Sequence, residues 1–251
     1  MEREFMFTKT IDQKHSDGWI INYSIQEFYK GNIDVLIIKN ANESTIHSIG
    51  TLEEQDLYGK TEVPIGTDNK EEDHVWQEED MMWHNDRAYL DDIHPFVGLY
   101  CKEAEEGSSP TYFCDAKKAW SKLDDNLKDK IKQEGPVEFS VRNYFERSAY
   151  PHDFRSEVYK RAFLMKSKTK QNIYRKDRFG EYVFFSPAYA KTKYFDELNN
   201  IFYDKDNIYV HDWKPNQLVI WNNMTVPHKR DHTPSHIKRR LIRYAFHPSR
   251  F

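Results

Sequence analysis

Short runs of β-branched and aromatic residues, separated by polar turns, dominate the hydrophobic pattern of this chain. Runs bounded by Gly, Pro, Asn, Asp and Ser are typical of β-strands. The pattern predicts strands at residues 19–23, 34–38, 96–101, 111–114, 137–141, 181–185, 207–210, 217–221 and 240–246. We find no internal repeat and no long linker rich in Pro, Gly or Ser.

Helices are expected at a few places between these strands. A short helix is predicted after Ser24, and Asp115 is placed to cap a helix that runs through residues 116–123. A further helical turn is predicted after Asp124, and another helix at residues 192–202. An Asp or Ser at the N-cap accepts a hydrogen bond from a free backbone N–H group. Many short strands with few inserted helices favour a mainly-β fold, a sandwich or jelly roll.

The length of the chain favours one domain over residues 1–251. Within it, residues 1–80 are expected to supply N-terminal strands and an acidic loop, and residues 81–251 the jelly roll that carries the motifs described below. The segment 61–80 is polar and acidic. Long loops in compact domains are often functional, so this segment is a candidate lid.

Composition narrows the classes of function. Aromatic residues make up 15% of the 251 residues, which indicates a packed globular protein although 31% of the residues are charged. The net charge is −4, and a basic stretch at residues 166–178 is offset by acidic runs elsewhere. The chain therefore has no overall attraction to nucleic acid, and we expect no nucleic-acid partner.

Cysteine use and hydropathy indicate the compartment. Cys101 and Cys114 are the two cysteines, too few for a disulfide framework, which favours a reducing environment. Residues 1–10 lack the apolar core of a signal peptide, and no run approaches the length of a membrane-spanning helix. We therefore expect a cytoplasmic protein without a membrane partner. The sequence leaves self-association into a homo-oligomer open.

Candidate chemistry begins at Trp83-His84-Asn85-Asp86, together with the late histidine His228. Residues i and i+2 of an extended segment share a face, so His84 and Asp86 can converge on one point. Two imidazoles and one carboxylate form the facial site of non-haem Fe(II) oxygenases, which leaves positions open for co-substrate and dioxygen. Because His-x-Asp triplets also occur by chance, the pattern requires support from other motifs.

That support comes from the order of motifs along residues 80–251. The segment 83–86 resembles the Trp-His-x-Asp motif of the taurine dioxygenase-like (TauD/TfdA) family, and residues 211–223 resemble its Trp-x-Pro-Gly-Asp-Leu-x-x-Trp-Asp-Asn motif. His228 follows, and Arg240 stands twelve positions later. Where the family has Gly-Gly-Asp-Thr, this chain has Ser-Ser-Pro-Thr, so only Thr111 matches.

The resemblance implies a double-stranded β-helix (a cupin-like jelly roll) and an Fe(II)- and 2-oxoglutarate-dependent dioxygenase. It implies His84, Asp86 and His228 as iron ligands, with Arg240 and Thr111 at the distal carboxylate of 2-oxoglutarate. A guanidinium offers that carboxylate a bidentate fork, and a hydroxyl adds one donor. Arg239 and Arg243 lie on the other strand face from Arg240, so we expect both to point outward.

The reaction implied consumes O2 and 2-oxoglutarate, releases succinate and CO2, and hydroxylates an unactivated carbon. Related halogenases carry Gly or Ala at the carboxylate position, so Asp86 favours hydroxylation. In sulfonate-oxidising members an arginine four positions beyond the 2-oxoglutarate arginine binds the sulfonate. Counted from Arg240 that position is Tyr244, which argues against taurine. Arg87 and Tyr89 follow the His-x-Asp motif and are candidate contacts for a small polar metabolite such as an amino acid.

Other interpretations remain open at this stage. His228, His232 and His236 recur at helical spacing and could bind zinc on a helix, although Pro227 and Pro234 interrupt the segment. An oxygenase acting on a carrier- or protein-bound substrate is an alternative, because a lid over residues 61–80 favours a free metabolite and an open groove a tethered one. A jelly roll that binds without catalysis is the third alternative, and the complete ligand set argues against it.

Overall fold

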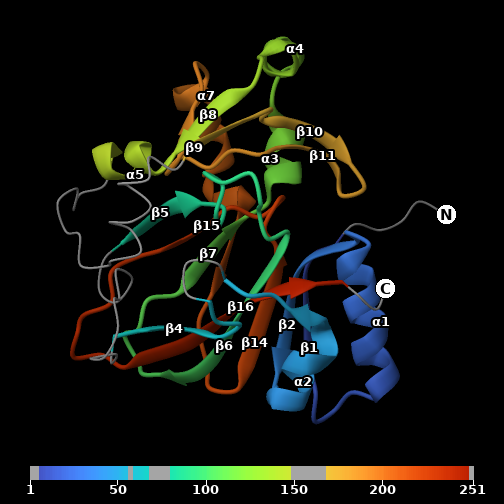
Figure 1. The fold of residues 1–251 in the computed structure, drawn as a ribbon. Coiled ribbons are helices and arrows are strands. Elements are labelled where there is room, and N and C mark those ends of the chain that lie inside the picture. Colours follow the sequence, from blue (N-terminus) through green and yellow to red (C-terminus); the bar gives the residue numbers. More distant parts are fainter. Residues whose placement is uncertain (1–5, 56–58, 68–79, 148–167, 249–251) are drawn as a thin grey trace.

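Two facing β-sheets form the body of the molecule (Figure 1). The computed structural model describes residues 6–55, 59–67, 80–147 and 168–248. The large sheet has the order β1-β2-β14-β6-β16-β3, and β4 also pairs with β16. Its strands are β1 (Met6–Asp12), β2 (Ile33–Lys39), β3 (Thr51–Leu52), β4 (Val63–Gly66), β6 (Phe96–Ala104), β14 (Gln217–Asn222) and β16 (Arg239–His247).

The smaller sheet has the order β13-β7-β15-β5. Its strands are β5 (Met81–His84), β7 (Thr111–Cys114), β13 (Ile208–His211) and β15 (His228–Arg230). All its pairings are antiparallel, as are those of the large sheet apart from β1 with β2. The mainly-β jelly roll expected from the sequence is confirmed.

The central strands of the large sheet are buried on both faces, which explains their nearly continuous apolar runs. In β14, Leu218 and Ile220 pack into one core with helices α1 (Gly18–Tyr29) and α2 (Glu43–Ile49). Val219 and Trp221 alternate with them and pack into a second core between the two sheets. This second core adjoins His228, whose ring packs against Trp221 at 4.8 Å between ring centroids.

Most of the predicted strands are confirmed. Those predicted at residues 34–38, 96–101, 111–114, 137–141, 181–185, 207–210, 217–221 and 240–246 correspond to β2, β6, β7, β8 (Val137–Ser140), β11 (Gly180–Val183), β13, β14 and β16. Asp115 and Asp124 cap α3 (Ala116–Lys122) and α4 (Asp125–Gln133), each accepting a backbone hydrogen bond. The helix predicted at residues 192–202 begins later, as α7 (Phe195–Phe202).

The strand predicted at residues 19–23 is wrong, because these residues open helix α1. Further along this helix Ile25, Phe28 and Tyr29 recur at helical spacing and are buried against the large sheet. Trp19 and Tyr23 lie on the outer side, where they are 66% and 50% exposed. A short apolar run fits either a strand or a helix, and the buried face that follows decides between them.

The polar segment expected as a loop at residues 61–80 contains a strand near its start. Residues 63–66 form β4, which pairs with residues 240–243 of β16. Gly66 permits this approach, since a Cβ atom there would lie 2.0 Å from the Arg239 carbonyl oxygen. Residues 68–79 lie outside the described residues, so the lid stays a prediction. In the described ranges, no helix is long and apolar enough to cross a membrane.

An insertion between β7 and β13 packs over one end of the two sheets (Figure 1). Besides α3, α4, α7, β8 and β11 it contains α5 (Val141–Arg147), β9 (Lys168–Gln171), β10 (Tyr174–Asp177), β12 (Ala190–Lys191) and the 3-10 helix η1 (Lys205–Asn207). It also contacts β5 and the segment that follows it. The Ala188 N–H group donates to the Trp83 carbonyl at 3.0 Å, and the Gln171 amide donates to the Ala88 carbonyl at 2.9 Å.

The buried histidine His211 makes the stability of the fold sensitive to acid. His211 of β13 is 4% exposed, and burial lowers its pKa to about 4. Between pH 6.5 and 4 the unfolded chain therefore binds a proton that the folded chain does not. The neutral, buried His211 therefore lowers stability progressively as the pH falls from 6.5 toward 4, and has no such effect above pH 6.5.

Between about pH 7 and pH 5, the unfolding free energy of His211→Gln should fall by about 2 kcal/mol less than that of the unmodified protein, because the substitution removes the buried titratable group. Urea unfolding at both pH values measures this drop. His47→Gln, at an exposed position of α2, is the matched control and should unfold with the pH dependence of the unmodified protein. An unchanged pH dependence in His211→Gln would contradict the assignment.

Candidate metal centre and adjoining pocket

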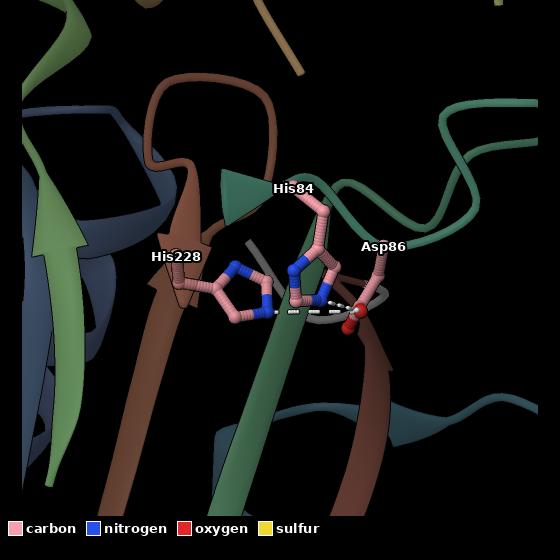
Figure 2. Close-up of side chains that lie close together, drawn as sticks. All are labelled: His84, Asp86 and His228. Atoms are coloured by element: carbon pink, nitrogen blue, oxygen red, sulfur yellow. Dashed lines mark ion pairs between the residues drawn. The ribbon is translucent and has the colours of Figure 1, made fainter. Parts of the chain in front are cut away.

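Strand pairing in the smaller sheet places two histidines directly opposite each other. His84 is the last residue of β5, His228 is the first of β15, and the two are paired in register. Asp86 lies two residues beyond His84, in the turn after the strand. Figure 2 shows both imidazoles directed at the Asp86 carboxylate, so the three predicted ligand residues are brought together.

The three side chains present donor atoms to one point. Nε2 of His84 lies 3.3 Å from Oδ1 of Asp86, and Nε2 of His228 lies 3.6 Å from the same oxygen. One ligand atom from each residue lies within 4.8 Å of the others. The His84 Nδ1–H group donates to the Met82 carbonyl at 2.8 Å, while its buried Nε2 has no hydrogen-bond partner among the described residues. Such an arrangement fixes the tautomer and leaves a lone pair for a metal.

The electrostatics favour the ionised form of Asp86 and the neutral form of His228. Burial raises the pKa of the Asp86 carboxyl, but the Arg243 guanidinium and both imidazoles outweigh burial and hold that pKa well below its usual range. Burial and then the adjacent His84 ring lower the pKa of His228 to about 4. An ionised carboxylate and a neutral imidazole are the forms in which these groups bind divalent iron.

Asn223 fixes the backbone that carries Asp86. Its side-chain oxygen accepts from the Asp86 N–H group at 2.9 Å, and its amide donates to the Asp86 carbonyl at 3.0 Å. The neighbouring Asn85 side chain donates to the Asn223 carbonyl at 2.6 Å. Asn223 belongs to the Trp221-Asn222-Asn223 motif, but the sequence pattern gave no reason to place it beside the carboxylate ligand.

Arg243 of β16 contacts the Asp86 oxygen that faces away from the histidines. Its Nε and Nη2 atoms donate to Oδ2 of Asp86 at 2.9 and 2.8 Å, and its Nη1 donates to the buried Gln55 side chain. Gln55 in turn donates to the Arg243 carbonyl at 3.1 Å. We expected Arg243 to point outward, and this expectation was wrong: the side chain lines the pocket beside the candidate ligands.

This pocket adjoins the three ligand residues and encloses about 430 Å³, including the space at its mouth. Thr111 and Arg239 line it, and both are buried. The Thr111 hydroxyl accepts from the Trp213 indole N–H at 2.9 Å, so its own hydrogen is available to a ligand. The Arg239 Nε donates to the Ser109 carbonyl at 3.3 Å, while its buried Nη1 has no hydrogen-bond partner within the described ranges.

Arg240 does not line this pocket, although we expected it to bind the co-substrate. Its side chain is 53% exposed and lies 3.5 Å from Glu103 on the outer part of the sheet. Arg239, at 1% exposed, occupies the inner face in its place. Adjacent strand residues point to opposite faces, so an error of one residue exchanges inside for outside.

The remaining predicted contacts lie away from the pocket. Tyr244 packs against Phe246 on the helix-covered face of the sheet, and its hydroxyl donates to Glu62 at 3.1 Å. Arg87 contacts His94 and Asp92, and Tyr89 packs against Tyr189 at 5.0 Å between ring centroids. None of the three lines the described pocket, and the substrate contacts expected at Arg87, Tyr89 and Tyr244 stay predictions.

The helical zinc site is also excluded by the backbone. Residues 228–230 are a strand, and His232 and His236 are exposed in the following loop. A strand places successive side chains on opposite faces and cannot stack residues four apart as a helix does. His228 therefore pairs with His84 instead of with its own later neighbours.

A family model for "Taurine catabolism dioxygenase TauD, TfdA family" matches residues 39–245. The chain belongs to the TauD/TfdA family. Its members are Fe(II)- and 2-oxoglutarate-dependent dioxygenases, so this TauD/TfdA protein is an enzyme of that class, with Fe(II), 2-oxoglutarate and O2 as its cofactor and co-substrates. No curated protein matches the chain in sequence.

Solved structures share the fold. AAD-2, crystallised in complex with Mn(II) and N-oxalylglycine, superposes with a TM-score of 0.72 at 17% identity, covering 97% of this chain and 95% of its own. A taurine dioxygenase from Burkholderia xenovorans superposes with a TM-score of 0.66 at 11% identity, covering 96% of this chain and 85% of its own. At such low identity these likenesses show the jelly roll of this TauD/TfdA protein and leave its substrate open.

We expect His228→Ala to weaken metal binding by more than about a hundredfold, because loss of an outer-shell partner alone costs roughly ten- to a hundredfold. Titration of the metal-free protein with Fe(II) under anaerobic conditions, or with Mn(II), measures the binding constant. His232→Ala is the matched control, since that histidine lies four residues further along in an exposed loop. Undiminished metal affinity in His228→Ala would overturn the ligand assignment.

Proposed function

We propose that this enzyme hydroxylates an unactivated carbon of a small polar metabolite that carries an anionic group, with release of succinate and CO2. The observation that carries this proposal is the position of Arg243. Its guanidinium lines the pocket and contacts Asp86, a candidate metal ligand, so an anion bound there would hold a substrate beside the metal.

The proposed roles follow from the chemistry of each group. His84, Asp86 and His228 would hold Fe(II), which supplies the activation of dioxygen and the oxidative decarboxylation of 2-oxoglutarate. Arg239 would bind the distal carboxylate, with the Thr111 hydroxyl as an additional donor. Asn223 would keep Asp86 in place, and the buried aromatic Trp221 would close the pocket against water.

Two features support hydroxylation over halogenation. Asp86 is present where the related halogenases have Gly or Ala, and it is held by Arg243 on one oxygen. The other oxygen faces the two histidines. A carboxylate in this position would occupy the coordination site that a halide requires.

The corrected register also changes the substrate argument. Counted from Arg239 in place of Arg240, the residue four positions later is Arg243 and not Tyr244. Three of the five N–H groups of Arg243 are engaged by Asp86 and Gln55, which leaves two for a substrate anion. The exclusion of taurine therefore loses its basis, and both carboxylates and sulfonates fit the proposal.

The adjacent residues Arg239 and Arg240 provide a test of the co-substrate site. We expect Arg239→Met to weaken 2-oxoglutarate binding by roughly thirty- to several thousandfold, because truncation of a buried carboxylate partner costs about 2–5 kcal/mol. Arg240→Met should change it by less than about threefold, because its side chain is exposed and paired with Glu103. Calorimetric titration of the Mn(II)-loaded protein measures both constants. A large effect at Arg240 with a small one at Arg239 would refute the corrected register.

The substrate class can be tested by mass spectrometry of turnovers with Fe(II), 2-oxoglutarate and a panel of amino acids, sulfonates and matched analogues in which the charged groups are replaced by uncharged amides. We expect a gain of one oxygen, or sulfite release from a sulfonate, on members that carry an anionic group and on none of the uncharged analogues. Reactions run with chloride should give no chlorinated product. A chlorinated product, or turnover confined to uncharged compounds, would contradict the proposal.

A further inference from the structure

A buried ion pair lies beside the turn that leads to His228. Asp34 of β2 is 1% exposed, and its Oδ2 atom lies 2.7 Å from Nζ of Lys117 in α3. The other carboxylate oxygen of Asp34 accepts a hydrogen bond from the Thr225 hydroxyl at 2.7 Å. Thr225 is itself fully buried. The carboxylate therefore joins a charged side chain of the insertion to the chain segment just before a candidate metal ligand.

Thr225 belongs to the turn that joins β14 to β15. Two residues earlier in this turn is Asn223, whose side chain bonds both the N–H group and the carbonyl of Asp86. Three residues later is His228, the first residue of β15. A displacement of the turn would therefore move one candidate ligand and loosen the backbone of another.

Strand pairing explains why Asp34 meets this turn. β14 pairs antiparallel with β2, and Trp221 stands opposite Val35. β14 therefore ends beside Asp34, and the chain beyond it turns over that carboxylate. Adjacent strand residues point to opposite faces, so Asp34 points away from the core between the sheets, to which Val35 belongs.

Backbone hydrogen bonds tie the same turn to the chain between β7 and α3. The Cys114 N–H group donates to the Pro227 carbonyl at 2.8 Å, and the Ala116 N–H group donates to the Thr225 carbonyl at 3.2 Å. The Thr225 hydroxyl adds a bond to the large sheet through Asp34. The turn is thereby fixed to both sheets at once.

The ion pair itself is costly for the fold. Burial raises the pKa of the Asp34 carboxyl to about 6, although Lys117 opposes this shift, and burial lowers the pKa of the Lys117 ammonium. Both shifts favour the uncharged forms in the folded state, so ionisation of the pair at neutral pH reduces stability. The pair is thus a weak source of stability, while it holds an acceptor in place for the Thr225 hydroxyl.

We propose that Asp34 is a positioning residue of the metal centre, which acts through the Thr225 hydroxyl to hold the turn that carries Asn223 and His228. Asp34 precedes the segment 39–245 that the family model matches. The inference rests on the candidate metal ligands and adds a support to them from β2. Without this hydrogen bond the turn would be free to shift, so the folded protein would bind the metal more weakly.

The decisive measurements are the metal affinity and the stability of the same variants. Metal-free protein is titrated with Mn(II), followed by the electron paramagnetic resonance signal of the free ion, and the free energy of unfolding is measured in urea. A change that only destabilises the fold lowers apparent affinity by no more than the fraction of protein that is unfolded. A shift of the dissociation constant in fully folded protein therefore reports on the site.

Thr225→Val removes the hydroxyl and keeps a branched side chain of similar size. We expect it to weaken Mn(II) binding by about tenfold, the lower end of the roughly ten- to hundredfold range for outer-shell partners. Thr225→Ser keeps a hydroxyl and should bind Mn(II) within about threefold of the unmodified protein. An unchanged Mn(II) affinity in Thr225→Val, with a lowered free energy of unfolding, would show a purely structural role and overturn the proposal.

Thr192→Val is the matched control. The Thr192 hydroxyl is also buried and also donates to a carboxylate, that of Glu134, at 2.8 Å. This bond joins two parts of the insertion, the C-cap of α4 and the residue after β12. Thr192→Val should therefore lower the free energy of unfolding and leave Mn(II) binding within about threefold of that of the unmodified protein.

A combined variant tests the carboxylate itself. Asp34→Ala together with Lys117→Met removes both charges, so that neither is left buried without the other. We expect about tenfold weaker Mn(II) binding, as for loss of an outer-shell partner. Adding Thr225→Val should cause no further loss, because both changes break the same hydrogen bond. Losses that add would mean that Asp34 and Thr225 act separately, which contradicts the proposal.

The His228→Ala variant, titrated alongside, separates this inference from the ligand assignment on which it rests. Undiminished Mn(II) binding by His228→Ala would remove the metal site and the positioning role together. If His228→Ala loses binding while Thr225→Val and the combined Asp34 variant keep it, the metal site stands and the positioning role alone fails.

Discussion

The pairing of β15 with β5 is the constraint on which the active site depends. It sets His228 opposite His84, and the turn after β5 then adds Asp86. A slip of one residue in this pairing would move either histidine to the opposite face of the sheet. Asn223 and Ser186 hold that turn from other elements through hydrogen bonds to Asp86 and Asn85, so the ligand geometry is fixed before a metal arrives.

The positive charges that line the pocket come from both sheets. Near the candidate ligands, Arg243 is matched by Asp86 and steadied by Gln55. At the far end, Arg230 and Arg239 approach from opposite sheets beside the Thr111 hydroxyl. The arrangement fits a co-substrate with two carboxylates better than it fits a neutral molecule.

Several features could be read from local patterns because neighbouring residues determine them. Asp115 and Asp124 were identifiable as caps, and the strand runs around Val35 and Val219 were identifiable from their composition. The helix at residues 18–29 was misread at its start, because Trp19-Ile20-Ile21 is apolar in a way that suits either structure. Its buried face becomes visible only when it packs on the large sheet.

The sequence by itself determined the family, the three candidate metal ligands and the alternation that separates Arg239 from Arg240. It could not decide which of these arginines faces the metal, because β16 is buried on both faces and carries apolar residues on each. Only the tertiary structure placed the smaller sheet on the side of Arg239 and Arg243, and the helices on the side of Tyr244. Arg230 and Arg239 likewise line one pocket from strands of different sheets, which no local pattern encodes.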